Sequence, residues 1–341
     1  MGDVYPNVGV AAVQAAPVWL NREATVDKAC RLIEEAGRNG AQVVAFPEGF
    51  LPGYPDWFHW YMPRSPESIR FSKELIKNAI EVPGPTTEAL CAAARRAGTY
   101  VVIGMNEREP KAMGSLYNAL LFIGPEGEIL GVHRKIVPTV TERIIHSYGD
   151  GSSIRTYDTP YGAIGGLICG ENTNSLARFA LLAQHERIHI ASWPAFASVH
   201  QRTAFDGMDI RVRYHAFEGR IFVISAAAVL TDDTISALGL SAEQKATITC
   251  RGGHSGIIGP RGNYIAGPAD DTEQILYADA DMDQVIEGKL IHDLTGHYNR
   301  LDVFTLVMKR VPRQALRIEE AERGAEQQEP EPEQAFVKVR C

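Results

Sequence analysis

The sequence predicts a layered α/β fold with mixed sheets. Short apolar runs rich in β-branched residues alternate with amphipathic helical patterns along the chain, which is typical of strands covered by helices. Turn sequences such as residues 124–127 (Gly-Pro-Glu-Gly) join neighbouring β-rich runs and indicate hairpins, so some strands are antiparallel. The chain has 341 residues, 45% hydrophobic and 22% charged, which suffices for one large domain or two tightly packed halves.

The first half of the chain is predicted to form five strands separated by three helices. In the first helical pattern Val26, Ala29 and Ile33 share one face, as a helix on a sheet requires. Residues 83–85 (Pro-Gly-Pro) separate the second helix from the third. The predicted strands are 8–13, 43–46, 100–103, 116–123 and 129–133, and the predicted helices are 23–38, 71–80 and 87–97.

The second half continues the alternation, with helices predicted at 175–187 and 209–218 and strands at 188–193 and 221–226. One further hairpin is expected to join 154–157 to 163–168, and another to turn at 259–263. Because no interdomain linker is visible, we expect one domain over residues 1–318. Residues 319–341 are rich in Glu and contain two prolines, and this composition predicts an acidic, disordered tail.

Composition and charge exclude several classes of protein. The 34 Lys and Arg against 42 Asp and Glu give a net charge of −8, which argues against a broad basic surface for nucleic acid. No apolar run approaches the roughly eighteen residues of a transmembrane helix, and the first residues lack the pattern of a secretion signal. The five cysteines are widely spaced, unlike a disulfide framework or paired zinc ligands. We expect a cytoplasmic protein with free thiols and no nucleic-acid or membrane partner.

Three residues at predicted strand ends have side chains suited to covalent catalysis. Cys169 ends an apolar strand and precedes a helix, a setting that projects a nucleophile and favours its thiolate. Glu48 follows a buried strand among apolar neighbours, which raise its proton affinity and suit it to take a proton from a thiol. Lys135 also follows a strand and could hold charge that develops on a substrate. Each residue alone could instead be structural: a buried cysteine, a solvated carboxylate or a surface lysine.

The order of these residues and their local sequences resembles the nitrilase superfamily of carbon-nitrogen hydrolases. The resemblance extends from Val8 to about Phe304, and it is closest to the true nitrilase branch. The stretches that carry it are 46–48 (Phe-Pro-Glu), 50–55 (Phe-Leu-Pro-Gly-Tyr-Pro), 133–135 (His-Arg-Lys), 138–139 (Pro-Thr) with Glu142, 169–172 (Cys-Gly-Glu-Asn) and 296–300 (Gly-His-Tyr-Asn-Arg). Two positions depart from that branch: Gly170 stands where many relatives carry Trp, and Leu301 where Pro is common.

The resemblance implies a four-layer α-β-β-α sandwich and a role for each residue. Glu48 would be the general base, Lys135 the stabilising cation and Cys169 the nucleophile. Glu142 matches an additional glutamate that positions substrate or assists proton transfer. The implied reaction converts an organic nitrile and water into a carboxylic acid and ammonia through a thioimidate and a thioester, without metal or organic cofactor. The subunits would form a homodimer or a larger spiral homo-oligomer.

Five residues are candidate contacts for the substrate. Tyr54 and Trp57 lie in an aromatic-rich loop after the predicted base, which could form a wall for an apolar nitrile substituent or could be a packed structural loop. Trp193 and Pro194 match a segment that lines the pocket in the family, and they could equally be core residues. Gly170 leaves room beside the thiol, so the substrate preference of Trp-bearing relatives does not transfer.

One competing motif and three other functions stay open. Residues 185–189 (His-Glu-Arg-Ile-His) match the H-E-x-x-H zinc signature, but the second histidine falls in a predicted strand, so we expect a chance match. An aliphatic amidase or a cyanide hydratase-like activity would use the same Glu-Lys-Cys residues. A non-catalytic binding or assembly protein is the alternative of a different class, although an intact trio argues against it.

Overall fold

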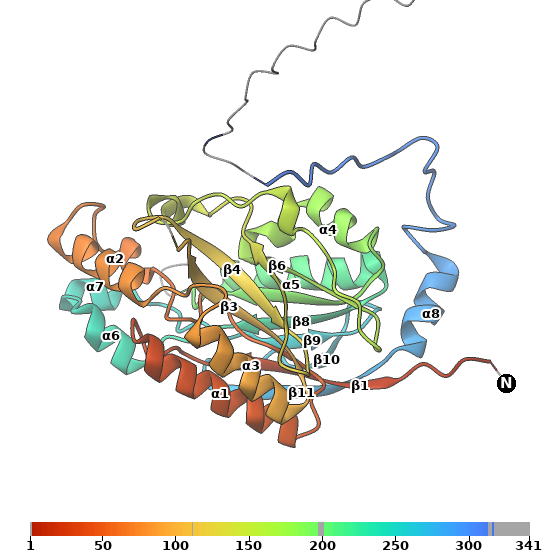
Figure 1. The fold of residues 1–341 in the computed structure, drawn as a ribbon, viewed down its shortest axis with the longest axis horizontal. Coiled ribbons are helices and arrows are strands. Elements are labelled where there is room, and N and C mark those ends of the chain that lie inside the picture. Colours follow the sequence, from red (N-terminus) through yellow and green to blue (C-terminus); the bar gives the residue numbers. More distant parts are fainter. Residues whose placement is uncertain (1, 111, 197–200, 313–315, 317–341) are drawn as a thin grey trace, which may run out of the picture.

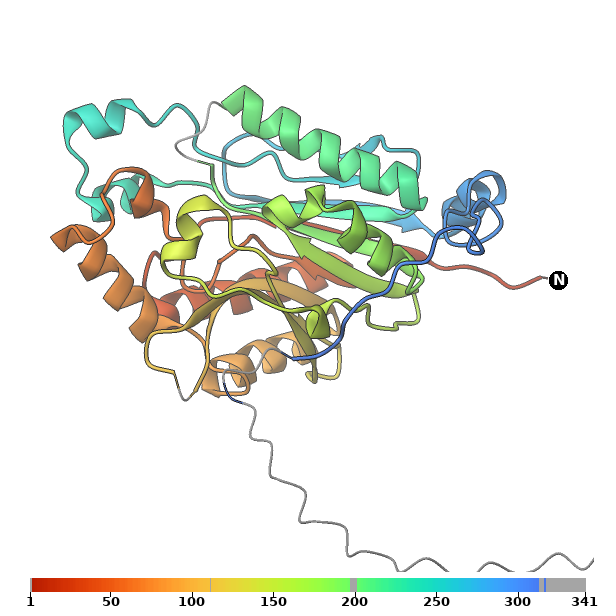
Figure 2. The same cartoon turned by 90° about the horizontal axis from the view of Figure 1, so that it is seen from above.

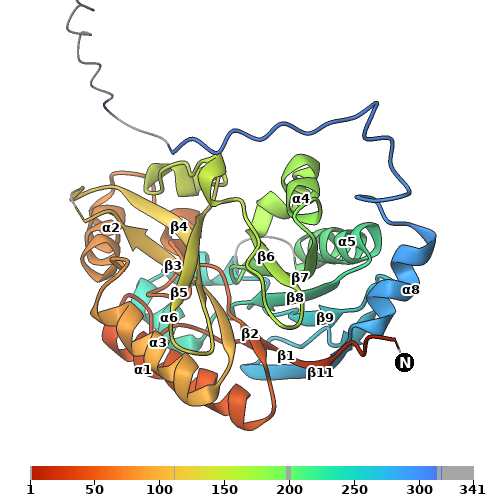
Figure 3. The same ribbon diagram turned by 45° about the vertical axis from the view of Figure 1, so that its right-hand side comes forward.

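Two β-sheets pack face to face, and helices cover the outer face of each (Figures 1 and 3). This computed structural model describes residues 2–110, 112–196, 201–312 and 316. The predicted acidic tail at 319–341 lies outside the described residues. The arrangement confirms the predicted four-layer α-β-β-α sandwich with mixed sheets.

The first sheet has six strands and joins the first part of the chain to a late strand. Its inner strands are parallel and its remaining pairs are antiparallel, including the β4–β5 hairpin predicted around residues 124–127. In spatial order the strands are β11 (Gln274–Asp281), β1 (Asn7–Gln14), β2 (Val43–Ala45), β3 (Tyr100–Arg108), β4 (Leu116–Ile123) and β5 (Ile129–Arg134).

The second sheet has five strands. Three of them are parallel, and the β9–β10 hairpin confirms the predicted turn at residues 259–263. In spatial order they are β10 (Tyr264–Ala266), β9 (Gly256–Ile258), β8 (Phe222–Ala227), β7 (Glu186–Trp193) and β6 (Ala163–Ile168). Strands β2 and β7 end close together, because the Glu48 amide after β2 donates to the carbonyl of Trp193 at the end of β7. Cys169 follows β6, the parallel neighbour of β7.

Alternating side chains divide the core into an inner layer and two outer layers. On β1, Val8, Val10 and Ala12 face the second sheet, whereas Ala11 and Val13 face the helices on the other side. Helices α1 (Arg22–Arg38) and α3 (Pro85–Ala97) cover the first sheet, and α4 (Ser175–Leu182) and α5 (Gln201–Gly219) cover the second (Figure 2). The central strands of both sheets are therefore shielded from water on both faces, whereas β5, β10 and β11 are partly exposed.

Other short elements border the sandwich. Helix α2 (Pro66–Asn78) packs with the 3-10 helix η1 (Asp56–His59) around a cluster of aromatic side chains. The remaining elements are α6 (Asp232–Leu238), α7 (Ala242–Ala246), α8 (Asp283–Ile291), η2 (Val140–Ile144), η3 (Gly151–Ser153) and η4 (Cys169–Thr173). The sequence patterns did not predict α6, α7, α8 or β11. The N-terminal end of the described chain lies beside α8 (Figure 1).

Several predicted elements were wrong in extent. The helix predicted at 209–218 begins at Gln201, and the strand predicted at 100–103 continues to Arg108. The helix predicted at 175–187 ends at Leu182, because Glu186 already belongs to β7 and His185 adopts a left-handed backbone conformation between the two. The first arm of the hairpin predicted at 154–157 is reduced to a single bridge between Tyr157 and Ile164, because residues 154–156 form no strand. Among the described residues, no helix is long and apolar enough to cross a membrane.

Gly104 on β3 tests how tightly the sheet packs against the turn after β2. A Cβ there would lie 2.1 Å from the Pro47 carbonyl oxygen and 2.8 Å from Glu48 Cα, and this backbone has little freedom to move. We expect Gly104→Ala to lower the free energy of unfolding in urea by about 1–3 kcal/mol. Gly114→Ala, which meets nothing within 4 Å, is the control and should change it by less than about 0.5 kcal/mol. Equal effects would contradict the packing described.

Candidate active site

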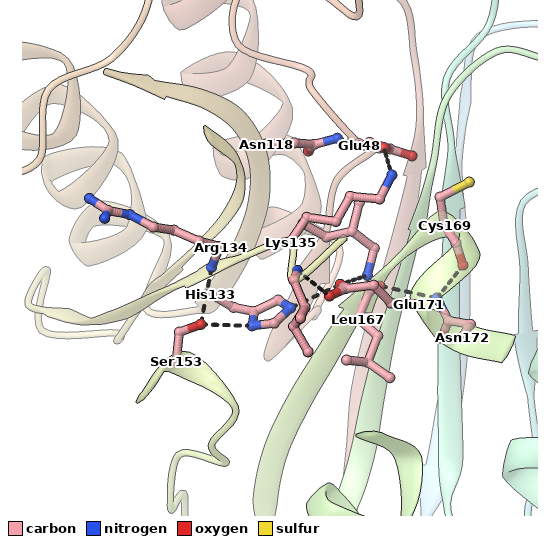
Figure 4. A network of polar contacts seen from close by, with 12 residues as sticks. Glu48, Asn118, His133, Arg134, Lys135, Ser153, Leu167, Cys169, Glu171 and Asn172 are labelled. Carbon is pink, nitrogen blue, oxygen red and sulfur yellow. Dashed lines mark hydrogen bonds and ion pairs between the residues drawn. The ribbon is translucent and has the colours of Figure 1, made fainter. Parts of the chain in front are cut away.

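The four residues predicted to carry chemistry meet at neighbouring strand ends. Glu48 lies in the turn after β2, Lys135 follows β5, Glu142 is in η2, and Cys169 begins η4 directly after β6. All four are buried, and Cys169 is the most exposed of them at 9%. Figure 4 shows the Glu48 carboxylate, the Lys135 ammonium and the Cys169 sulfur on the same side of the β6 strand end. The structure thus brings together residues that are up to 121 positions apart (169 − 48).

Lys135 is the centre of this group. Its Nζ lies 2.8 Å from Glu48 Oε1 and 2.8 and 2.9 Å from the two carboxylate oxygens of Glu142. Burial alone would lower the pKa of Lys135, but the charges of Glu48, Cys169 and Glu142 outweigh burial and raise it. The ammonium is therefore permanently charged, and all three of its protons have acceptors within reach.

The two carboxylates beside this ammonium differ in their environments. Burial raises the pKa of Glu48 to about 7, although Lys135 opposes the shift. Burial would raise the pKa of Glu142, but the Lys135 ammonium, which contacts both carboxylate oxygens, lowers it. A 2.8 Å hydrogen bond donated by Tyr54 also lowers it. Glu142 therefore stays ionised, and Glu48 is the carboxylate that can exchange a proton near neutral pH.

Asn118 is a site residue that the sequence analysis missed. Its Nδ2 donates to Glu48 Oε1 at 2.6 Å and reaches Glu142 Oε2 at 3.3 Å. It sits inside the apolar strand β4, so nothing in the local pattern marks it as functional. With Oε1 held by Asn118 and Lys135, Glu48 Oε2 is left without a hydrogen-bond partner among the described residues. That oxygen is the one available to receive a proton.

Cys169 sits on a strained elbow at the end of β6. Its φ of +47° is unusual for a residue with a Cβ, and it turns the chain abruptly from strand into η4. Burial, followed by the Glu48 charge, raises the pKa of the thiol, although a hydrogen bond from the Gly170 amide favours the thiolate. The sulfur therefore rests as a thiol and needs a nearby base in order to attack. The arrangement suits proton transfer from sulfur to Glu48 as an electrophile approaches.

Glu171 links the Lys135 and Cys169 segments across the two sheets, a function that its sequence position did not reveal. Its Oε1 accepts the Ile136 amide at 2.7 Å, and its Oε2 accepts the Ile168 amide at 3.0 Å and His133 Nε2 at 2.9 Å (Figure 4). Burial opposes the charge, but His133 outweighs it and lowers the pKa of Glu171. Since Ile136 follows Lys135 and Ile168 precedes Cys169, one carboxylate holds both segments in register.

The predicted substrate contacts fall in different places. Tyr54 is part of the group, through its hydrogen bond to Glu142. A Cβ on Gly170 would meet only Thr139 Oγ1, at 3.4 Å, so there is space next to the nucleophile. Trp193 is the last residue of β7 and Pro194 follows it. Both are buried, and the Trp193 carbonyl accepts a hydrogen bond from the Glu48 amide at 3.3 Å. Trp57 instead packs among Trp19, Phe58 and Phe71 in the aromatic cluster of η1 and α2, and none of its described contacts reaches the four residues.

The H-E-x-x-H pattern does not form a helical zinc site. His185 is exposed in a turn, whereas Glu186 and His189 lie on β7, as the predicted strand required. Unexpectedly, Glu186 and His189 form a buried cluster with His215 of α5, in which the potential ligand atoms lie within 4.8 Å of one another. His185 is thus exposed to solvent, whereas His189 is buried and hydrogen-bonded within the cluster.

Comparison with known proteins identifies relatives along most of the chain. The family model described as carbon-nitrogen hydrolase matches residues 9–289. The chain is 38% identical to an aliphatic nitrilase of Rhodococcus rhodochrous over 87% of this chain and 81% of that protein. It is 36% identical to an arylacetonitrilase of Hypocrea virens over 92% of this chain and 95% of that protein. A carbon-nitrogen hydrolase structure from Helicobacter pylori G27 has a TM-score of 0.68 at 21% identity, covering 87% of this chain and 97% of that one, and shows the same fold.

Replacing Glu171 with Gln measures the strength of the link between the two segments. The amide keeps the volume but cannot accept both backbone hydrogen bonds and the histidine. We therefore expect Glu171→Gln to lower the free energy of unfolding in urea by about 1–3 kcal/mol. Glu34→Gln, which breaks an exposed ion pair with Arg96, is the control and should cost about 0–1 kcal/mol. Indistinguishable losses would show that Glu171 is not a structural link.

Proposed function

This chain belongs to the carbon-nitrogen hydrolase family, in its nitrilase branch, and we propose that it hydrolyses an organic nitrile to a carboxylic acid and ammonia, with Cys169 as the nucleophile. The observation that carries the proposal is the buried Lys135 ammonium held between Glu48 and Glu142 beside a buried thiol. A binding or assembly role would not require a base, a cation and a nucleophile in contact.

The first chemical step forms a carbon–sulfur bond. Cys169 Sγ attacks the nitrile carbon while Glu48 Oε2 takes the thiol proton, and one π pair of the C≡N bond moves to nitrogen. Glu48 returns the proton to that nitrogen, which gives a neutral thioimidate. A nitrile carbon is a weak electrophile, so a thiolate is a suitable attacker. The Lys135 ammonium stabilises the negative charge that develops on nitrogen.

Two water molecules complete the reaction. Glu48 takes a proton from the first water as the water oxygen attacks the thioimidate carbon, and it passes that proton to the nitrogen, which becomes an amino group. The proton of the new hydroxyl group is then transferred to the nitrogen through Glu48, the carbonyl forms, the carbon–nitrogen bond breaks and ammonia leaves. A thioester remains on Cys169. Attack by the second water releases the carboxylic acid and restores the thiol. Glu142 and Tyr54 hold the Lys135 ammonium in place, so the same base and cation serve each step.

The substituent on the nitrile carbon approaches on the side of Gly170 in this proposal. The named relatives act on different nitriles, an aliphatic nitrilase in Rhodococcus rhodochrous and an arylacetonitrilase in Hypocrea virens. The space beside Gly170 suits a bulkier substituent than a Trp at that position would admit. The other predicted contacts with the substrate are Tyr54, Trp57, Trp193 and Pro194. Of these, Trp57 acts through its neighbours, because it is packed in the aromatic cluster.

We further propose that one hydrolase domain spans residues 1–318 and that the enzyme works in the cytoplasm as a homodimer or a larger spiral homo-oligomer. Cys30, Cys91, Cys169 and Cys250 are all free in the described chain, which suits a reducing compartment. Ile210, Tyr214 and Phe217 form an exposed apolar face on α5, and this surface supports association with a second subunit. The role of residues 319–341 stays open.

The reaction itself is tested with a panel of aliphatic, aromatic and arylacetic nitriles and the corresponding amides. We expect ammonia release from nitriles with acid as the main product, at a rate that a metal chelator leaves unchanged. Cys169→Ala should abolish turnover because the nucleophile is lost, whereas Cys91→Ala, which removes another buried thiol on α3, should keep it. Turnover of amides alone would identify an amidase. Release of the amide as the main product from nitriles would identify a nitrile hydratase-like enzyme. No turnover of either class would overturn the proposal.

The pKa of Glu48 predicts the acid limb of the pH profile. Glu48 must be ionised to take the thiol proton, and burial raises its pKa from 4.5 to about 7. We therefore expect kcat/KM to fall as pH decreases through about 7. Burial, followed by the Glu48 charge, also raises the pKa of Asp56 to about 7, so Asp56→Asn is the control and should keep the limb. A limb near pH 4.5, or one that disappears in Asp56→Asn, would show that Glu48 is not the titrating base.

A further inference from the structure

A second buried charge cluster lies behind the nucleophile and is not used by the proposed mechanism. It consists of Glu186 and His189 on β7 and His215 on α5, and none is more than 1% exposed. His189 Nδ1 lies 2.7 Å from Glu186 Oε1, and His215 Nε2 lies 3.1 Å from Glu186 Oε2. The H-E-x-x-H residues therefore belong to a hydrogen-bonded network that a strand and a helix build together.

Asn172 connects this cluster to the active site. Its Nδ2 donates to the carbonyl of Leu167 at 3.2 Å and to that of Cys169 at 3.1 Å, on either side of the elbow. Its Oδ1 consequently faces His189 Nε2, at 2.9 Å. The chain of contacts runs from the Cys169 backbone through Asn172, His189 and Glu186 to His215.

The hydrogen bonds determine the charge of His189. Nδ1 faces a carboxylate oxygen of Glu186 and Nε2 faces the amide oxygen of Asn172, so both ring nitrogens must carry hydrogen to satisfy their partners. The ring is then an imidazolium, and the Glu186 carboxylate neutralises it. Burial, reinforced by the charge on His189, lowers the pKa of His215 to about 4, so His215 is neutral and donates through Nε2.

A cation at this position has a directional effect on Asn172. The imidazolium can only donate, so it fixes the Asn172 amide with its oxygen toward β7 and its nitrogen toward the elbow carbonyls. The Arg178 side chain also donates a 2.8 Å hydrogen bond to the backbone carbonyl oxygen of Asn172. Cys169 needs such support, because its left-handed backbone is unfavourable for a residue with a side chain.

We propose that His189, charged by Glu186 and supported by His215, is a positioning residue that holds Asn172 and thereby keeps the Cys169 elbow in its strained, reactive geometry. A buried ion pair gives little net stability compared with apolar side chains, so stability alone does not explain the cluster. A divalent metal bound to the same atoms would be the rival cation. The 2.7 and 3.1 Å contacts instead have the lengths of direct hydrogen bonds, with a proton in each.

The test separates positioning of the nucleophile from general destabilisation. Two quantities are measured on the folded His189→Phe variant. The first is kcat and KM, determined separately with a nitrile that the enzyme hydrolyses. The second is the rate at which iodoacetamide alkylates Cys169, followed by mass spectrometry of the peptide that contains Cys169. We expect kcat and the alkylation rate to fall together by about tenfold to a hundredfold, with KM changed by less than about twofold.

Thr25→Val is the matched control for loss of a buried hydrogen bond. Thr25 is fully buried on α1, where its hydroxyl donates to the Val18 and Asn21 carbonyls, and it lies outside both polar networks. Its variant should be destabilised without any change in kcat or in Cys169 alkylation. Should His189→Phe not fold, Glu186→Gln, which keeps the side-chain volume and removes the neutralising charge, is judged by the same criteria.

Two results would overturn the inference. One is a folded variant whose kcat and Cys169 alkylation rate match those of the unmodified enzyme. The other is a stoichiometric metal ion in the purified protein that His189→Phe loses, since the cation would then be the metal. The kcat arm rests on the proposed function, but alkylation does not require turnover. Failure to find a nitrile substrate therefore leaves the positioning test intact.

Discussion

The burial of one ammonium between two carboxylates is the constraint on which the rest of this nitrile hydrolase depends. Lys135 neutralises one negative charge, so Glu48 and Glu142 cannot both be stable as anions in a site closed to water. Glu142, with both oxygens on the ammonium and a hydrogen bond from Tyr54, keeps its charge. Glu48 is left as the group whose protonation can vary, and it is the group that we propose as the base.

This charge arrangement requires three chain segments to converge, and the fold supplies the convergence at its strand ends. Glu48 follows a parallel strand of one sheet, Cys169 follows a parallel strand of the other, and Lys135 follows an antiparallel edge strand. Glu171 then joins the last two directly through backbone amides. The tight packing of the two sheets thus fixes the positions of the reactive atoms as well as supplying stability.

The layered fold could be predicted because its signals are local, whereas the candidate site residues stood out only when their local sequences were taken together as a family resemblance. Glu48, Lys135 and Cys169 each follow an apolar strand, and strand ends are where such sites form. Asn118 could not be found this way, since it interrupts an apolar strand without any change in its pattern. The cluster of Glu186, His189 and His215 needs a contact between β7 and α5 that no local pattern contains. The helix predicted to Arg187 failed for a local reason: its apolar periodicity continues into β7, and a left-handed residue ends it.

The pairing of β11 with β1 affects how the chain is made. Of the strands in the sandwich, β1 leaves the ribosome first and β11 last, yet the two pair along their full length. Strand β1 lies between β11 and β2, and β2 leads to Glu48. Until β11 emerges, the edge of β1 that faces away from β2 carries unpaired amide and carbonyl groups. A nascent chain of this enzyme therefore exposes an open sheet edge while the intervening strands are made, and that edge is covered only when the last strand of the sandwich emerges.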